Sequence, residues 1–154
     1  MDSPGSVLSR VRQYVSRRKG AAPMSVSVLI VDDEEPIRRF VDRVLREAGY
    51  KTSMAGNGAE ALEVAATIES LDLLVTDVMM PKMMGDELAR RLRQDKPSHK
   101  VLNLTGFSDS LFKEKVTLWE DEAYLDKPCT IKSLLQAVSM LYFGSLEKPA
   151  AAEC

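Results

Sequence analysis

The chain has 154 residues, of which 45% are hydrophobic and 29% charged, and its net charge is -2. This balance is ordinary for a single globular domain and argues against a protein that binds nucleic acid through its overall charge. The sequence has neither an apolar run near the ~18 residues of a membrane span nor the apolar core of a signal peptide, so we expect a cytoplasmic protein.

The first 24 residues form a basic arm. They contain five Lys and Arg residues against one Asp, a local charge of +4, which leaves -6 for the remainder. Hydrophobic residues recur at helical spacing before the Gly-Ala-Ala-Pro sequence at 20–23, which predicts a short amphipathic helix. A solvated extension is our first interpretation of the arm. Docking on a partner or on its own domain is the second, and contact with an anionic membrane is the least favoured.

From Ser25 onward, short apolar runs alternate with amphipathic stretches, a pattern typical of a parallel β/α sheet. We expect strands near 26–31, 50–54, 71–76, 101–105 and 123–126. We expect helices near 35–48, 58–69, 86–95, 109–118 and 130–143. The residues at the helix ends agree, because Pro36 suits a first helical turn, Gly49 a C-terminal cap and Thr130 an N-terminal cap.

Reactive side chains stand at the ends of four of these strands. Asp32 and Asp33 close the first strand, Asp77 the third, Thr105 the fourth and Lys127 the fifth. In an open α/β sheet, ligands collect at the carboxyl ends of the strands. Three acids brought together there would repel one another, and an oxygen-only site of this kind suits Mg²⁺. Taken singly, each motif is better explained as a turn, a cap or a solvated loop, so the prediction depends on their convergence.

Four motifs in chain order resemble those of a known family: Val31-Asp32-Asp33, Thr76-Asp77-Val78-Met79-Met80-Pro81, Leu104-Thr105-Gly106 and Tyr124-Leu125-Asp126-Lys127-Pro128. Over residues 25–143 the chain resembles the receiver domain of two-component response regulators, the family of the chemotaxis response regulator. The resemblance implies a flavodoxin-like (βα)5 fold, a doubly wound five-stranded parallel sheet with strand order 2-1-3-4-5. Residues 144–154 would be a tail too short for an output module. We therefore expect a regulator that acts by docking, or a receiver excised from a hybrid histidine kinase.

The resemblance also implies a phosphorylation site. Asp77 would be the nucleophile that accepts a phosphoryl group from a phosphohistidine. Asp32, Asp33, Asp77 and the backbone carbonyl of Met79 would hold Mg²⁺, and Lys127 would contact a phosphoryl oxygen. The protein would then be a regulatory phosphoacceptor that promotes its own phosphotransfer and dephosphorylation, and not a turnover enzyme.

Two further residues would make the switch. Thr105 would donate its hydroxyl to the phosphoryl group, and its movement would open space for the ring of Tyr124 to rotate. That rotation would alter the surface formed by the helix at 109–118, the last strand and the last helix. A half-buried strand aromatic remains the simpler interpretation of Tyr124.

The implied partners are a histidine kinase or a histidine phosphotransfer protein, docked on the helix at 35–48, and a downstream protein target. We expect no nucleic acid partner, and a homodimer is possible.

A phosphorylation-independent pseudo-receiver is the retained alternative. A phosphatase of the haloacid dehalogenase type is disfavoured because Met79 stands where a second acid is needed. The single histidine, His99, is expected to be exposed, and Cys129 and Cys154 to be free thiols.

Overall fold

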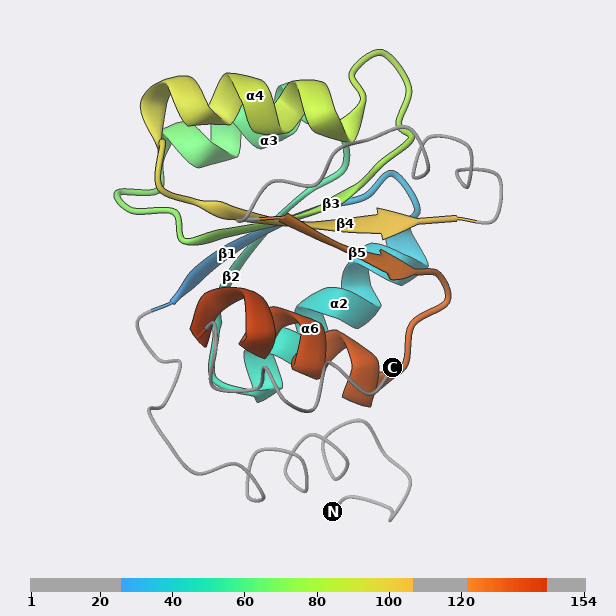
Figure 1. The fold of residues 1–154 in the computed structure, drawn as a ribbon. Helices are drawn as coiled ribbons and strands as arrows, with labels where there is room; N and C mark the ends of the chain where they lie inside the picture. Colours follow the sequence, from blue (N-terminus) through green and yellow to red (C-terminus); the bar gives the residue numbers. More distant parts are fainter. Residues whose placement is uncertain (1–25, 107–121, 144–154) are drawn as a thin grey trace.

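The computed structural model describes residues 26–106 and 122–143. The strands in these residues form one five-stranded parallel sheet (Figure 1). The strand order is β2-β1-β3-β4-β5, which confirms the predicted doubly wound, flavodoxin-like arrangement. The strands are β1 (Ser27–Val31), β2 (Lys51–Ala55), β3 (Leu73–Asp77), β4 (Lys100–Thr105) and β5 (Glu122–Asp126).

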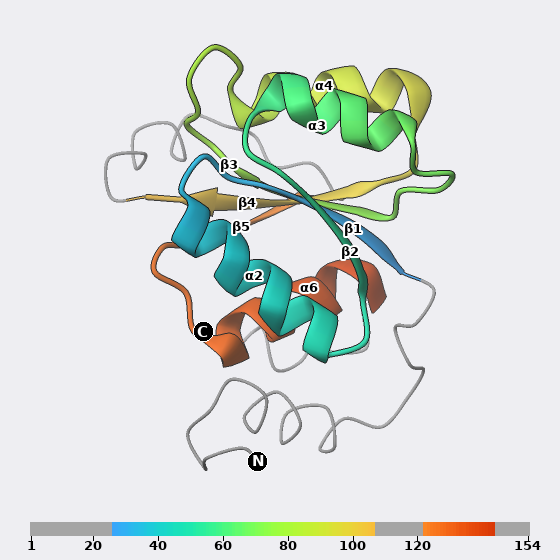
Figure 2. The same cartoon turned by 180° about the vertical axis from the view of Figure 1, so that it is seen from behind.

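Helices cover both faces of the sheet. One face carries α2 (Glu35–Glu47) and α6 (Ile131–Phe143), and the other carries α3 (Gly58–Ala66) and α4 (Gly85–Asp95), as Figures 1 and 2 show from opposite sides. The helices of each pair contact one another as well as the sheet. The molecule therefore has three layers, with a hydrophobic core on each side of the sheet.

The side chains of β1 alternate between the two cores. Val28 and Ile30 pack in the cluster beneath α2 and α6, whereas Leu29 and Val31 pack in the cluster beneath α3 and α4. Successive side chains of a strand point to opposite faces, so a central strand covered on both sides must be apolar throughout. This explains why the central strands β1 and β3 appear in the sequence as mainly hydrophobic runs.

The roles predicted for Pro36, Gly49 and Thr130 at helix ends are confirmed. Pro36 lies in the first turn of α2. At the other end Gly49 has a φ of 102°, and its N–H and that of the next residue donate to Arg46 and Leu45 at 3.0 Å, which closes the helix in a Schellman motif. Thr130 caps α6 by accepting a hydrogen bond at Oγ1 from the N–H of Ser133, at 3.0 Å.

Two sequence predictions are wrong. The helix expected to reach residue 69 ends at Ala66, because the hydroxyl of Thr67 donates to the carbonyl of Val64 at 2.7 Å and closes the last turn. His99 is fully buried, and its Nδ1 lies 2.7 Å from the carbonyl oxygen of Lys96. The polar loop before β4 thus folds over this ring instead of leaving it in solvent.

The arm at 1–24, the helix expected at 109–118 and the tail at 144–154 lie outside the described residues. Among the described helices, none is both long enough and apolar enough to cross a bilayer.

Candidate phosphorylation and metal site

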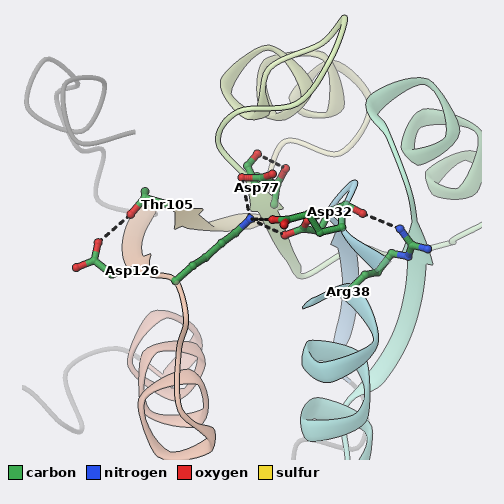
Figure 3. Close-up of polar contacts among 8 residues, drawn as sticks. Asp32, Arg38, Asp77, Thr105 and Asp126 are labelled. Carbon is green, nitrogen blue, oxygen red and sulfur yellow. Dashed lines mark hydrogen bonds and ion pairs between the residues drawn. The ribbon is translucent and has the colours of Figure 1, made fainter. Parts of the chain in front are cut away.

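The predicted site residues gather at the carboxyl edge of the sheet (Figure 3). Asp77 ends β3, Thr105 ends β4 and Asp126 ends β5, while Asp32 directly follows β1 and Lys127 directly follows β5. Parallel strands present their carboxyl ends at the same edge, so residues nearly 100 positions apart in sequence become neighbours.

Three carboxylates form an acidic cluster at this edge. One oxygen from each of Asp32, Asp33 and Asp77 lies within 4.8 Å of the others. Asp32 and Asp77 are buried, whereas Asp33 is exposed. Buried negative charges so close together require a positive partner, since little water reaches them.

Lys127 supplies that positive charge. Its Nζ lies 3.1 Å from Oδ2 of Asp32 and 3.2 Å from Oδ1 of Asp77, and its side chain is only 11% exposed. A third contact, of 3.3 Å, joins Nζ to the exposed carboxylate of Glu34. The ammonium therefore bridges the ends of β1 and β3 from its position after β5.

Burial dominates the electrostatics of the acids. It raises the pKa of Asp77 from 3.8 to about 7, with a further rise from the charge of Asp32 and an opposing effect from Lys127. The pKa of Asp32 is also raised by burial, although the hydrogen bond from the N–H of Glu34 and the ammonium of Lys127 oppose the rise. Burial by itself would lower the pKa of Lys127, but its contacts with Asp32 and Asp77 outweigh this effect and raise it.

Asp32 is held in place from both its side chain and its backbone. Its Oδ1 accepts a hydrogen bond from the N–H of Glu34 at 2.8 Å, and its carbonyl oxygen accepts one from Nη1 of Arg38 at 2.7 Å (Figure 3). From the sequence, Arg38 was only one residue of the helix at 35–48 on which a partner is expected to dock. Sequence reasoning missed this contact because a bond to a backbone carbonyl leaves no signature in the sequence of the acidic motif.

The backbone around Asp77 is fixed by close packing. The N–H of Val78 donates to the carbonyl of Leu104 at 3.1 Å, and the carbonyl of Val78 accepts from the N–H of Gly85 at 2.9 Å. Gly85, the first residue of α4, lies so close to the Asp77 carbonyl oxygen that a Cβ at this position would collide with it. Glycine is therefore needed here for the close approach of two backbones.

Thr105 and Tyr124 lie on the β4–β5 side of the site. Thr105 is buried, and its hydroxyl donates to Oδ1 of Asp126 at 2.8 Å. Tyr124 is half-buried, and the pKa of its phenol is raised by that burial and by the nearby charges of Glu122 and Asp86. The predicted rotation of its ring stays a prediction.

The donor set fits a hard divalent cation such as Mg²⁺. All three clustered side chains offer carboxylate oxygens, and Oδ2 of Asp32 is a buried oxygen without a hydrogen bond among the described residues, although the ammonium of Lys127 lies beside it. Mg²⁺ prefers a few carboxylates and keeps several waters. Met79 follows two residues after Asp77 and is 46% exposed, and its role as a backbone ligand stays a prediction.

The fold and this site together define a receiver domain. Residues 28–139 match the family described as the response regulator receiver domain, and the chain therefore belongs to that family. Receiver domains are regulatory modules of two-component signalling and generally bind Mg²⁺ at an acidic pocket, and this chain has an acidic cluster formed by Asp32, Asp33 and Asp77.

The relatives include a receiver protein that the match covers almost entirely and a much longer sensor kinase. The chain is 33% identical to the response regulator receiver protein CpdR of Brucella abortus over 77% of this chain and 98% of that protein. It is 34% identical to the sensor kinase CckA of the same organism over 74% of this chain, and so spans only 12% of the kinase. Among solved structures, the receiver domain of the response regulator AraT from Geobacillus stearothermophilus is 30% identical, with a TM-score of 0.67 over 85% of this chain and all of that one.

Proposed function

We propose that this chain is a phosphoacceptor of a two-component phosphorelay and that Asp77 is the residue modified. The observation that carries the proposal is the position of its carboxylate, which ends β3 within 3.2 Å of Lys127 and within 4.8 Å of two further acids. In this proposal residues 25–143 are the signalling unit, flanked by the arm at 1–24 and the tail at 144–154.

The reaction is a phosphoryl transfer from a phosphohistidine. A carboxylate oxygen of Asp77 attacks phosphorus, the P–N bond of the donor breaks, and the electron pair stays on the imidazole nitrogen. Asp32, Asp33, Asp77 and the Met79 carbonyl would hold Mg²⁺, whose positive charge would reduce the repulsion between the carboxylate and the phosphoryl oxygens. Burial raises the pKa of Asp77 to about 7 and so favours its protonated form. Positive charge next to the carboxylate, from Lys127 and from a bound cation, favours the ionised form that acts as the nucleophile.

Lys127 and Thr105 act on the phosphoryl oxygens. The ammonium of Lys127 already lies 3.2 Å from an oxygen of Asp77, so a phosphoryl group added to that carboxylate remains within its reach. Thr105 donates its hydroxyl to another phosphoryl oxygen, and Tyr124 follows it inward. The surface around β5 and α6 then differs between the two states and binds a downstream protein only in one of them.

The upstream partner is a histidine kinase or a histidine phosphotransfer protein, as the kinship with response regulators and with a sensor kinase suggests. It docks beside the site on α2, where Arg39 and Arg43 are exposed. We propose that the exchange takes place in the cytoplasm, that nucleic acid is not a partner, and that any homodimer forms through the surface that switches.

Intact mass after incubation with acetyl phosphate and Mg²⁺ tests the proposal. One added phosphoryl group is expected, and it should be lost in Asp77→Asn and in the presence of chelator. The exposed acid Asp95, far along α4, provides the control, because Asp95→Asn should be modified like the wild type. An unmodified wild-type chain would contradict the proposal and favour the phosphorylation-independent pseudo-receiver.

A further inference from the structure

Asp126 lies beside Thr105, the residue proposed to sense the phosphoryl group. It pairs with Thr105 in the parallel register of β4 and β5, which places the two side chains side by side at the sheet edge. The Thr105 hydroxyl donates to Oδ1 of Asp126 at 2.8 Å (Figure 3). Asp126 is itself exposed and directly precedes Lys127.

A hydroxyl carries a single hydrogen, and so Thr105 has one donor to give. While that donor is used on Asp126, it cannot be used on a phosphoryl oxygen at Asp77. The exchange of one acceptor for the other is therefore part of the switch. A hydrogen bond to a carboxylate is stronger than one to a neutral acceptor, so Asp126 is an effective competitor for the Thr105 hydroxyl.

We propose that Asp126 is a positioning residue that holds Thr105 away from the phosphorylation site and thereby raises the phosphoryl occupancy needed to switch the domain. The inference rests on the proposed function, because it concerns the same threonine. It goes further by assigning the resting state of the switch to one side chain outside the acidic cluster.

The bond can be removed without disturbing the strand pair. The N–H of Lys127 donates to the carbonyl of Thr105 at 2.8 Å, and the β4–β5 register continues from this bond through five residue pairs. Both interactions belong to the backbone. Asp126→Ala should therefore fold like the wild type, and Asp126→Asn keeps an acceptor of the same shape while removing the charge.

The test is a titration of the full 154-residue chain with beryllium fluoride, a non-covalent mimic of the phosphoryl group, at saturating Mg²⁺. The amide signal of residue 105 in NMR spectra reports the half-saturating concentration. We expect Asp126→Ala to lower that concentration about three- to tenfold, with a smaller change for Asp126→Asn. Asp95→Ala, which removes an exposed carboxylate away from the site, should leave it unchanged.

A double-mutant cycle separates competition for the hydroxyl from simple charge repulsion. In a Thr105→Val background, Asp126→Ala should have no further effect, because no hydroxyl remains to be released. An equal half-saturating concentration for the wild type and Asp126→Ala would overturn the inference, as would an undiminished effect in the Thr105→Val background. Absence of binding by the wild type would instead overturn the proposed function, and the inference with it.

Discussion

Asp77 must be ionised to act as a nucleophile, but its burial destabilises the ionised form in the folded protein. Its pKa in the folded protein is raised from 3.8 to about 7, mainly by burial. Between these two pH values, the folded state therefore holds a proton that the unfolded state has released. The stability contributed by this group is fully present below pH 4 and is lost as the pH rises through 7. The metal-free domain should therefore become less stable between pH 5 and pH 8.

Asp77→Asn should remove that loss. In chelator, its free energy of unfolding relative to the wild type should increase between pH 5 and pH 8 by about 2–3 kcal/mol, the difference that linkage gives for this pKa shift. Urea unfolding at the two pH values measures it, with the exposed Asp95→Asn as control. A difference between Asp77→Asn and the wild type that does not change with pH would contradict the assigned electrostatics.

Lys127 is the cation that compensates the buried acids. Lys127→Ala removes the ammonium that contacts both Asp32 and Asp77, and loss of one partner from a buried ion pair is strongly destabilising. We expect a loss of about 3 kcal/mol in chelator, partly restored when Asp77→Asn is added to the variant. Chemical denaturation of both single variants and the double variant checks this, and strictly additive losses would mean that the lysine does not act through Asp77.

At the scale of elements, the start of α4 packs closely against the backbone of the site. Gly85→Ala would place a methyl group against the Asp77 carbonyl oxygen, a backbone atom that cannot move independently of the nucleophile. We expect a loss of more than about 2 kcal/mol in stability together with slower phosphorylation. Gly49→Ala is the matched control, since it strains the α2 end at a φ of 102° for about 1–2 kcal/mol but should leave the phosphorylation rate intact. Equal phosphorylation by both variants would argue against this contact.

The strands and most helix ends could be predicted because local chemistry determines them. The apolar run of β1, the first-turn proline of α2 and the glycine at 49 each specify one local conformation. The end of α3 could not be predicted, because Ile68 continues the apolar pattern past the residue whose hydroxyl closes the helix. His99 was misplaced because burial in a loop depends on tertiary packing and not on the polarity of its neighbours.

The site was predictable for a different reason. Strand ends in a parallel sheet converge, so Asp32, Asp77, Thr105 and Lys127 could be placed at one edge once the strands were known. Individual contacts across that edge could not, because they require the register of neighbouring strands. The bond from Thr105 to Asp126 is of this kind. The bond from Arg38 to the Asp32 carbonyl was missed for a different reason, because its acceptor is a backbone oxygen.

At the scale of the whole molecule, ion pairs connect the ends of separate strands at the carboxyl edge of the sheet. In the absence of metal, Lys127 alone links β1 and β3 to the end of β5 among the described site contacts. A cation bound by the acidic cluster would add a second link between β1 and β3 that is available only in the folded state. Ligand that binds only the folded state stabilises it by RT ln(1 + [L]/Kd), which is about 2.7 kcal/mol at one hundred times Kd.

Saturating Mg²⁺ should therefore raise the melting temperature of the wild type by about 5–10 °C, given the usual response of a domain of this size. Asp33→Asn should abolish most of the rise while leaving the melting temperature in chelator nearly unchanged, because that side chain is exposed. Thermal unfolding with MgCl₂ and with NaCl at matched ionic strength separates site binding from general screening. A rise of the same size in NaCl, or an undiminished rise in Asp33→Asn, would mean that the cluster does not hold the cation.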